Sequence, residues 1–480
     1  MTVLLILFTC ALSVINGIRI MDSTYWYDEM FSIMLIRMPI SELIEKTAKD
    51  VHPPLYYLIL KGVCHFVGES GPVLHAVSLL PYLMVLVLSL TVVRKWFSRS
   101  TSVVLVTFAS LLASAVKFNV EIRMYSWVVL FVLVSYLSLY AILYRNRAVD
   151  YAIFILASLA AAYTHYYALI AVAFFYLVLM LYALIVRREI LLRVVITWGL
   201  SALGYVRWLL VLLETFGRTS SGWWMRWMPK YKDSLPAIFE GRHSWILFYI
   251  FAAVLSAAVA ALIVEIATGK RMDPDRDPVK ELTFLAAGAA SVFGTIAVGV
   301  IVSRLFRPMY FERYIYTAAV CAWLITAIGL SRVRVRGVAF LSIALTVFVC
   351  YCGFYNYTEI YRQDEADRVM TESSVALIRE CNAGMGTPLI TDKDSDIRIM
   401  AYFPHNERYK LNLENGLDTD VIEKGKEYCL VADNLLTDDE ITTMREAGFT
   451  CQEVRPELFK DDPDRGGFLG DLNVFVYILK

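Results

Sequence analysis

The sequence predicts an α-helical multi-pass membrane protein with about eleven transmembrane helices, followed by a small α/β domain outside the membrane. The 480 residues are 58% hydrophobic and only 19% charged, whereas a soluble domain is about 45–50% apolar and about 25% charged. The apolar residues form runs of about 20 residues, the length that a helix needs to cross a hydrocarbon core of about 30 Å. After Thr358 these runs stop and a polar sequence begins.

The predicted spans are stretches with few or no charges. The longest stretch, Tyr151–Val186, has 36 residues and is interrupted only by His165. As one helix it would be about 54 Å long at about 1.5 Å per residue, so it is predicted to form two spans that turn at Thr164–Tyr167. The other nine spans are Thr2–Ile18, Pro72–Val93, Thr101–Val116, Met124–Tyr144, Val194–Leu213, Ser244–Val264, Leu282–Val302, Tyr314–Ser331 and Gly337–Thr358.

The basic residues predict the orientation. With a cytoplasmic N-terminus, the inner loops hold 15 Lys and Arg in 39 residues and the outer segments hold 14 in 99, as the positive-inside rule requires. A cleaved signal peptide is the alternative for residues 1–18. The missing basic n-region and the missing cleavage motif favour an uncleaved first span. A multi-pass protein of the cell membrane with an extracytoplasmic C-terminal domain is therefore expected.

The predicted domains are a membrane domain, 1–358, and an α/β domain, 359–480. The second contains no nucleotide-binding loop and no evident catalytic set. Its alternating pattern predicts a helix at Asp364–Cys381 and another at Asp438–Ala447 behind a Thr437 cap. Strands are predicted at Pro388–Thr391, Tyr428–Ala432, Phe449–Val454 and Val474–Leu479.

Charge and cysteine content exclude some functions. The formal net charge is zero, which removes any electrostatic argument for nucleic-acid binding. Five of the eight cysteines lie in or beside apolar segments, and no zinc-binding spacing occurs. The outer domain holds Cys381, Cys429 and Cys451, which allow one disulfide without indicating which pair forms it.

Two acidic residues stand out in the first outer segment. Asp28 and Glu29 follow Tyr25-Trp26-Tyr27, aromatic residues that prefer the headgroup region. A carboxylate held beside apolar rings can have a raised pKa and act as a base. The alternative is a solvated acidic pair at the start of a helix over 29–38.

Histidine and arginine recur in the other outer segments. His52 precedes Pro53-Pro54 and a short apolar helix over 53–67, where it could equally cap that helix. In the tight turn 117–125, Glu121 and Arg123 either form an ion pair or bind an anion, with Glu121 orienting Arg123, and Tyr125 follows. His165 lies in the predicted hairpin turn. Basic residues are less frequent in outer loops than in inner ones. Even so, one outer segment contains Arg304, Arg307 and Arg313, which suit phosphate binding or headgroup anchoring.

Successive loops alternate between the two sides of the membrane, and with eleven spans this alternation places all these residues on the same outer face. Such a gathering of acids, histidines and arginines suits chemistry on a lipid-linked phosphate. The order and spacing of five motifs resemble the GT-C glycosyltransferases, and in particular the group of dolichyl-phosphate-mannose protein mannosyltransferases and lipid A aminoarabinose transferases. The motifs are Asp28-Glu29, His52-Pro53-Pro54-Leu55-Tyr56-Tyr57, Glu121-x-Arg123-x-Tyr125, Tyr163-Thr164-His165-Tyr166 and Arg307-Pro308-x-x-Phe311-x-Arg313-Tyr314.

The resemblance implies a polyprenyl-phosphate-linked sugar as donor and inverting transfer to a protein, lipid or cell-envelope glycan acceptor on the outer face. It implies that Asp28 is the base, that Glu29 assists it, and that no cofactor or metal is needed. Arg123 and Arg313, with Arg307 or His165, would stabilise the leaving phosphate.

Two positions depart from the family pattern. Val51-His52 replaces the Glu-Lys pair of the aminoarabinose transferases, which argues against that activity. Arg207-Trp208 replaces a Pro-Trp pair and places a charge inside a predicted span. The alternative function is a transporter or flippase of a lipid-linked or polar solute, which would require charges at midspan and internal symmetry.

Overall fold

A computed structural model describes the chain except residues 1, 22–23, 219–230, 272, 274–275, 307, 333–335, 382–387, 392–394, 411–422, 424, 447, 455–466 and 470–471. It contains two compact units. The first comprises Met1–Ile20 and Ile40–Thr358, and the second comprises Met21–Pro39 and Glu359–Lys480. Residues 21–39, which the sequence interpretation assigned to the membrane domain, thus pack with the C-terminal unit.

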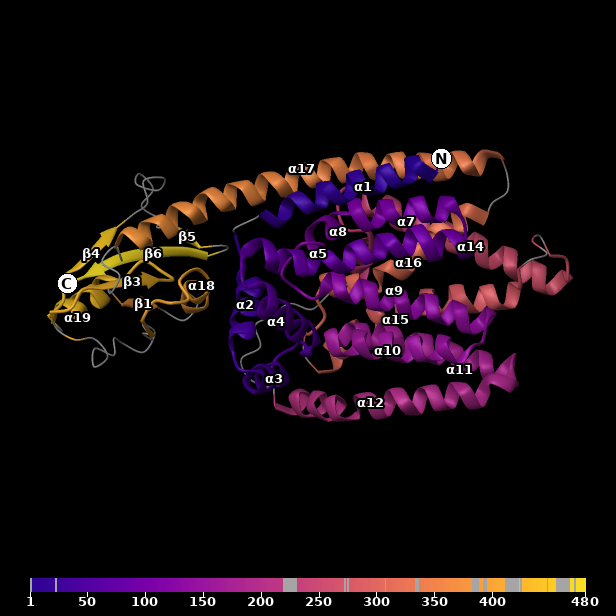
Figure 1. Ribbon diagram of the computed structural model, residues 1–480, viewed down its shortest axis with the longest axis horizontal. Coiled ribbons are helices and arrows are strands. Elements are labelled where there is room, and N and C mark those ends of the chain that lie inside the picture. Colours follow the sequence, from indigo (N-terminus) through magenta and orange to yellow (C-terminus); the bar gives the residue numbers. More distant parts are fainter. Residues whose placement is uncertain are drawn as a thin grey trace. The chain divides into compact units, whose positions relative to one another are not determined.

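Helices make up the first unit (Figure 1). Eight helical segments in the described part of the chain are long and apolar enough to cross a membrane, which confirms the multi-pass prediction. Two predicted spans are shorter apolar helices, α7 and α10. The main helices are α1 Thr2–Ile18, α3 Ile40–Ala48, α4 Leu55–Val67, α5 Gly71–Leu88, α7 Arg99–Leu111, α8 Ala113–Phe118, α9 Tyr125–Tyr144, α10 Ala148–Thr164, α11 Tyr166–Ile185, α12 Leu191–Arg218, α14 Ser244–Thr268, α15 Pro278–Leu305 and α16 Tyr316–Arg332.

The predicted break within 151–186 is confirmed, and its cause is local. His165 has an extended backbone with φ −156° and separates α10 from α11. Its Nδ1 accepts a hydrogen bond of 3.1 Å from the Tyr167 backbone N–H. The imidazole therefore caps the second helix, satisfying a backbone donor that would otherwise have no intrahelical partner.

The most buried helices of the first unit are α9 and α16, which pack against each other. The helix α9 also packs against α5 and α10, and α11 packs against α10 and α15. Close approach requires a glycine at one position of α15. A Cβ on Gly299 would lie 2.4 Å from the Tyr310 ring, so only glycine lets this ring pack directly on the helix.

The second unit is built on a mixed sheet of order β2-β1-β3-β6-β4, with β5 paired to β6. The strand β1 is parallel to β2 and β3, whereas β6 is antiparallel to β3, β4 and β5. The predicted strands and the 438–447 helix are present, and α18, β2 and β5 were not predicted. The elements are β1 Leu389–Thr391, α18 Ser395–Tyr402, β2 Arg408–Lys410, β3 Tyr428–Ala432, α19 Asp438–Glu446, β4 Cys451–Val454, β5 Gly467–Leu469 and β6 Leu472–Leu479.

The predicted helix at 364–381 is the end of a longer one. A single helix, α17, runs from Arg336 to Cys381 and includes the last predicted span. No proline and no glycine lies between Gly353 and Cys381, so nothing in the sequence interrupts helical hydrogen bonding there.

Side-chain contacts join residues 21–39 to α18. The helix α2, Tyr27–Arg37, packs on α18. The rings of Tyr25 and Tyr402 stack with centroids 5.5 Å apart, and the Arg37 guanidinium donates to the Met400 carbonyl.

Candidate functional site

Two buried histidines form the centre of a polar cluster in the first unit. The rings of His52, from the loop before α4, and His165 lie 4.9 Å apart between centroids. The ring of Tyr314, from a 3-10 turn at Glu312–Ile315, lies 5.1 Å from His165. Tyr125, at the start of α9, lies 6.0 Å from His165. Four segments that are distant in sequence therefore meet here.

Arg123 is held beside this cluster by a braced turn. It is only 2% exposed, and its Nη1 donates to the Tyr57 hydroxyl at 3.2 Å. The turn is fixed by His75, whose Nδ1 lies 2.7 Å from the Val120 carbonyl oxygen. Asn119 donates to the Asn16 amide oxygen at 3.1 Å. This bracing orders a buried guanidinium before any ligand arrives.

Arg313 supplies a second positive charge. Its guanidinium lies 5.2 Å from the Phe311 ring centroid and 5.8 Å from that of Tyr314. The faces of aromatic rings attract a guanidinium group, and its planar set of N–H donors matches the geometry of carboxylate and phosphate.

Both imidazoles are neutral in this environment. Burial, followed by the charges of Arg123 and Arg313, lowers the pKa of His165 to about 3. Burial is also the largest cause that holds the pKa of His52 well below its usual value, with smaller contributions from Arg123, His165 and Arg313. Because Nδ1 of His165 accepts from Tyr167, its proton is on Nε2.

Three buried polar atoms of the cluster have no hydrogen-bond partner among the described residues. They are His52 Nδ1, His165 Nε2 and the Tyr125 hydroxyl. An unpaired buried polar group costs about 1–3 kcal/mol. An anion with several acceptor oxygens would remove this cost at His165 and Tyr125, which can donate, and would be attracted by both guanidiniums. A cation would be repelled by them.

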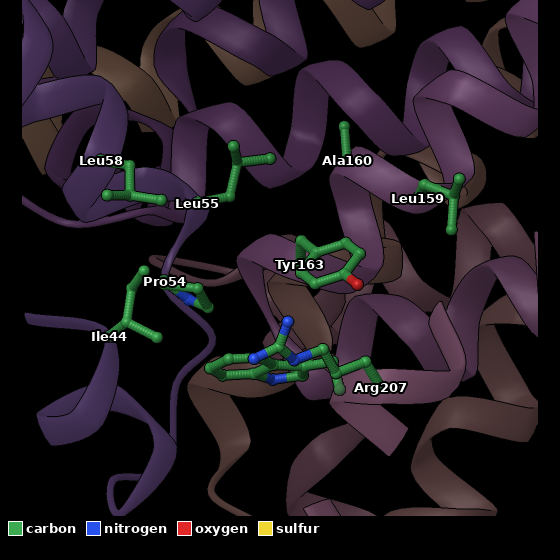
Figure 2. Close-up of a pocket in the computed structure, with 9 residues that line it drawn as sticks. Ile44, Pro54, Leu55, Leu58, Leu159, Ala160, Tyr163 and Arg207 are labelled. Carbon is green, nitrogen blue, oxygen red and sulfur yellow. The ribbon is translucent and has the colours of Figure 1, made fainter. Parts of the chain in front are cut away.

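Two cavities are lined in part by the segment 50–54. One, of about 150 Å³, is lined by His52, His165 and Tyr314 and extends to apolar residues of α12 and α15, among them Leu212 and Val302. The other, of about 430 Å³, is mainly apolar, and Figure 2 shows Arg207 opposite Leu55 and Leu58 in it. Arg207 has no hydrogen bond or ion pair with the residues that the structure describes.

The structure brings together His52, Arg123, Tyr125, His165 and Arg313 of the predicted site. Glu121 is buried, and its carbonyl accepts from the Arg123 backbone N–H at 2.6 Å. Arg307, which the sequence predicted as a phosphate ligand, lies outside the described residues. Tyr57 and Tyr167 also contribute, through hydrogen bonds to Arg123 and His165. Neither residue was predicted, and the only sequence signal for Tyr57 is its place in the motif His52-Pro53-Pro54-Leu55-Tyr56-Tyr57.

The predicted acids belong to the second unit. The Glu29 carboxylate is 5% exposed and accepts from the Trp26 backbone N–H at 3.2 Å, so it caps α2. Asp28 is half-buried on the same helix, and its backbone carbonyl accepts from the Ser32 hydroxyl at 3.0 Å.

No protein-family model and no curated protein sequence matches the chain. Two solved structures are similar to it. ArnT from Cupriavidus metallidurans in the apo state aligns with a TM-score of 0.61 and 10% identity over 98% of this chain and 97% of that one. The same protein bound to undecaprenyl phosphate aligns with a TM-score of 0.60 and 11% identity over the same shares. These likenesses establish the fold, and the chain has the GT-C fold of ArnT, as the sequence resemblance predicted.

Proposed function

We propose that the chain is an integral membrane glycosyltransferase that moves a sugar from a polyprenyl-phosphate carrier to an acceptor hydroxyl on the outer membrane face. The observation that carries the proposal is the buried cluster in which two guanidinium groups, of Arg123 and Arg313, act on the neighbouring imidazoles of His52 and His165. The solved ArnT structure with undecaprenyl phosphate supports this class of donor.

The cluster would bind the donor phosphate. Arg123 and Arg313 would neutralise its charge, with Glu121 orienting Arg123, and the Nε2–H of His165 would donate to a phosphate oxygen. Hydrogen bonds to charged groups contribute about 1.5–3 kcal/mol each. As the bond between the sugar C1 and the phosphate oxygen breaks, charge builds on that oxygen, so these donors would stabilise the transition state.

The cavity geometry suits a lipid carrier. The cavity beside His52 and His165 continues to apolar side chains of α12 and α15, including Leu212 and Val302. A phosphate in the cluster would thus have its isoprenoid chain directed among membrane helices. A soluble sugar nucleotide would gain nothing from this apolar extension.

The base is assigned from the sequence motif. Asp28 would take the proton of the acceptor hydroxyl as its oxygen attacks the sugar C1 with inversion, and the lipid monophosphate would leave. Glu29 would assist by fixing the start of the helix that carries Asp28, since it already caps α2.

Mass spectrometry of lipids that co-purify with the protein tests the donor class. A polyprenyl monophosphate or its glycosylated form is expected with the wild-type chain and should be depleted from an Arg123→Ala/Arg313→Ala variant. Bulk phospholipid alone in both samples would contradict the proposal. Transport of the lipid across vesicles, without any sugar transfer, would favour the transporter alternative.

A further inference from the structure

The C-terminal unit contains three cysteines, and the sheet separates them by face. Side chains alternate along a strand, so Cys429 and Val431 of β3 point to one face while Tyr428 and Leu430 point to the other. Cys451, on β4, packs on the face of Tyr428 and Leu430. It therefore lies on the opposite side of the sheet from Cys429.

Cys381 reaches the same face as Cys429. It is the last residue of α17, whose final turns pack Leu377 and Ile378 against that face of the sheet. Its side chain joins the cluster that contains Cys429. The two thiols interact directly, which lowers the pKa of Cys381, while that contact and burial hold the pKa of Cys429 well above the usual value.

The two cysteines differ in access. Cys381 is partly exposed at the end of a helix, and Cys429 is buried. An external oxidant can reach the first thiol, and only an internal attack can engage the second. The thiolate is the nucleophile in this chemistry, so a lowered pKa at the exposed member favours reaction there first.

We propose that Cys381 and Cys429 form a disulfide bond that fastens the end of α17 to the central strand β3. The Cys381 thiolate would attack the disulfide of a thiol–disulfide oxidoreductase, giving a mixed disulfide and one released thiolate. The Cys429 thiol would then lose its proton and attack Cys381 Sγ, so the oxidoreductase leaves as a dithiol carrying both electrons. The inference rests on the predicted extracytoplasmic location and is independent of the glycosyltransferase proposal.

The bond would close a ring around β1, α18 and β2. It encloses the 47 residues from 382 to 428, and a loop of this size is expected to stabilise the folded unit. For a unit of about 140 residues, reduction should lower the melting temperature of the full-length protein by at least about 5 °C.

Thiol mapping tests the pairing. Membranes are dissolved in denaturing detergent that contains excess N-ethylmaleimide, so that buried free thiols also react, and the full-length chain is then digested with and without reductant. We expect six of the eight cysteines to be alkylated and one peptide pair to join Cys381 to Cys429. Cys381→Ser and Cys429→Ser should each leave seven alkylated cysteines, whereas the matched control Cys451→Ser should keep the bond and leave five.

Two results would overturn the proposal. One is alkylation of all eight cysteines in the membrane-derived protein, and the other is a bond that involves Cys451. A second arm separates pairing from location, because oxidised glutathione applied to the reduced, purified protein should link Cys381 to Cys429 wherever the unit lies in the cell. Failure of that reaction would show that the two thiols do not pair at all.

Discussion

Replacing His165 by asparagine separates its two roles. The imidazole accepts at Nδ1 from the Tyr167 backbone at 3.1 Å, which caps α11, and Nε2 is a buried donor without a partner among the described residues. Asparagine is among the best N-capping residues, so its side-chain oxygen can keep the cap. The shorter amide does not reproduce the imidazole Nε2–H. The variant should therefore fold normally and bind phosphate less well.

The size of the effect follows from the hydrogen bond that is removed. A hydrogen bond to a charged group contributes about 1.5–3 kcal/mol, so His165→Asn should weaken binding of undecaprenyl monophosphate by about 10- to 150-fold. The melting temperature should change little, because the cap is retained. His165→Ala should lose the same affinity and in addition about 1 kcal/mol of stability, since alanine caps poorly.

Binding can be measured by thermophoresis with the protein in nanodiscs, alongside thermal melting. His65→Asn is the matched control, because His65 is an exposed histidine of α4 outside the cluster. Wild-type affinity in His165→Asn, with an unchanged melting temperature, would refute the assignment of His165 to the phosphate. A large loss of stability would refute the capping argument.

Three further predictions concern pH and the remaining charged residues. The pKa of His165 is lowered to about 3 by burial and the two arginines, so the unfolded chain binds a proton below about pH 6.5 while the folded one does not. Because of this residue, the free energy of unfolding should fall by up to about 2 kcal/mol from pH 7 to pH 5. The melting temperature of His165→Asn should therefore change less between these pH values than that of the wild type. Asp28→Asn should keep lipid binding and lower the rate of sugar transfer by at least about 100-fold. Wild-type transfer would exclude Asp28 as the base. Arg313→Ala should raise the KM for the polyprenyl-phosphate sugar, with Arg313→Lys intermediate, and an unchanged KM would remove Arg313 from the donor site.

Local features of the sequence were sufficient for most of the membrane helices and for four of the six strands that the structure describes. The break at His165 followed from the thickness of the membrane, because a helix of 36 residues cannot fit within it. The Thr437 cap predicted the start of α19, and in the structure the Thr437 hydroxyl accepts from the Glu440 backbone N–H at 3.3 Å while the Thr437 backbone N–H donates to the Glu440 carboxylate at 2.7 Å. Such signals act between residues a few positions apart, so they can be read without knowing the fold.

Pairings between distant residues required the tertiary structure. The alternation of inner and outer loops predicted one membrane face for His52, Arg123, His165 and Arg313. It did not predict that the ring centroids of His52 and His165 lie 4.9 Å apart. Strand alternation placed Cys429 and Val431 on one face but did not reveal which helix covers it. The sequence predicted residues 21–39 to belong to the membrane domain, yet the helix α2 and Tyr25 of this segment pack on α18. Periodicity specifies which face of an element is buried, whereas its partner depends on packing against segments hundreds of residues away.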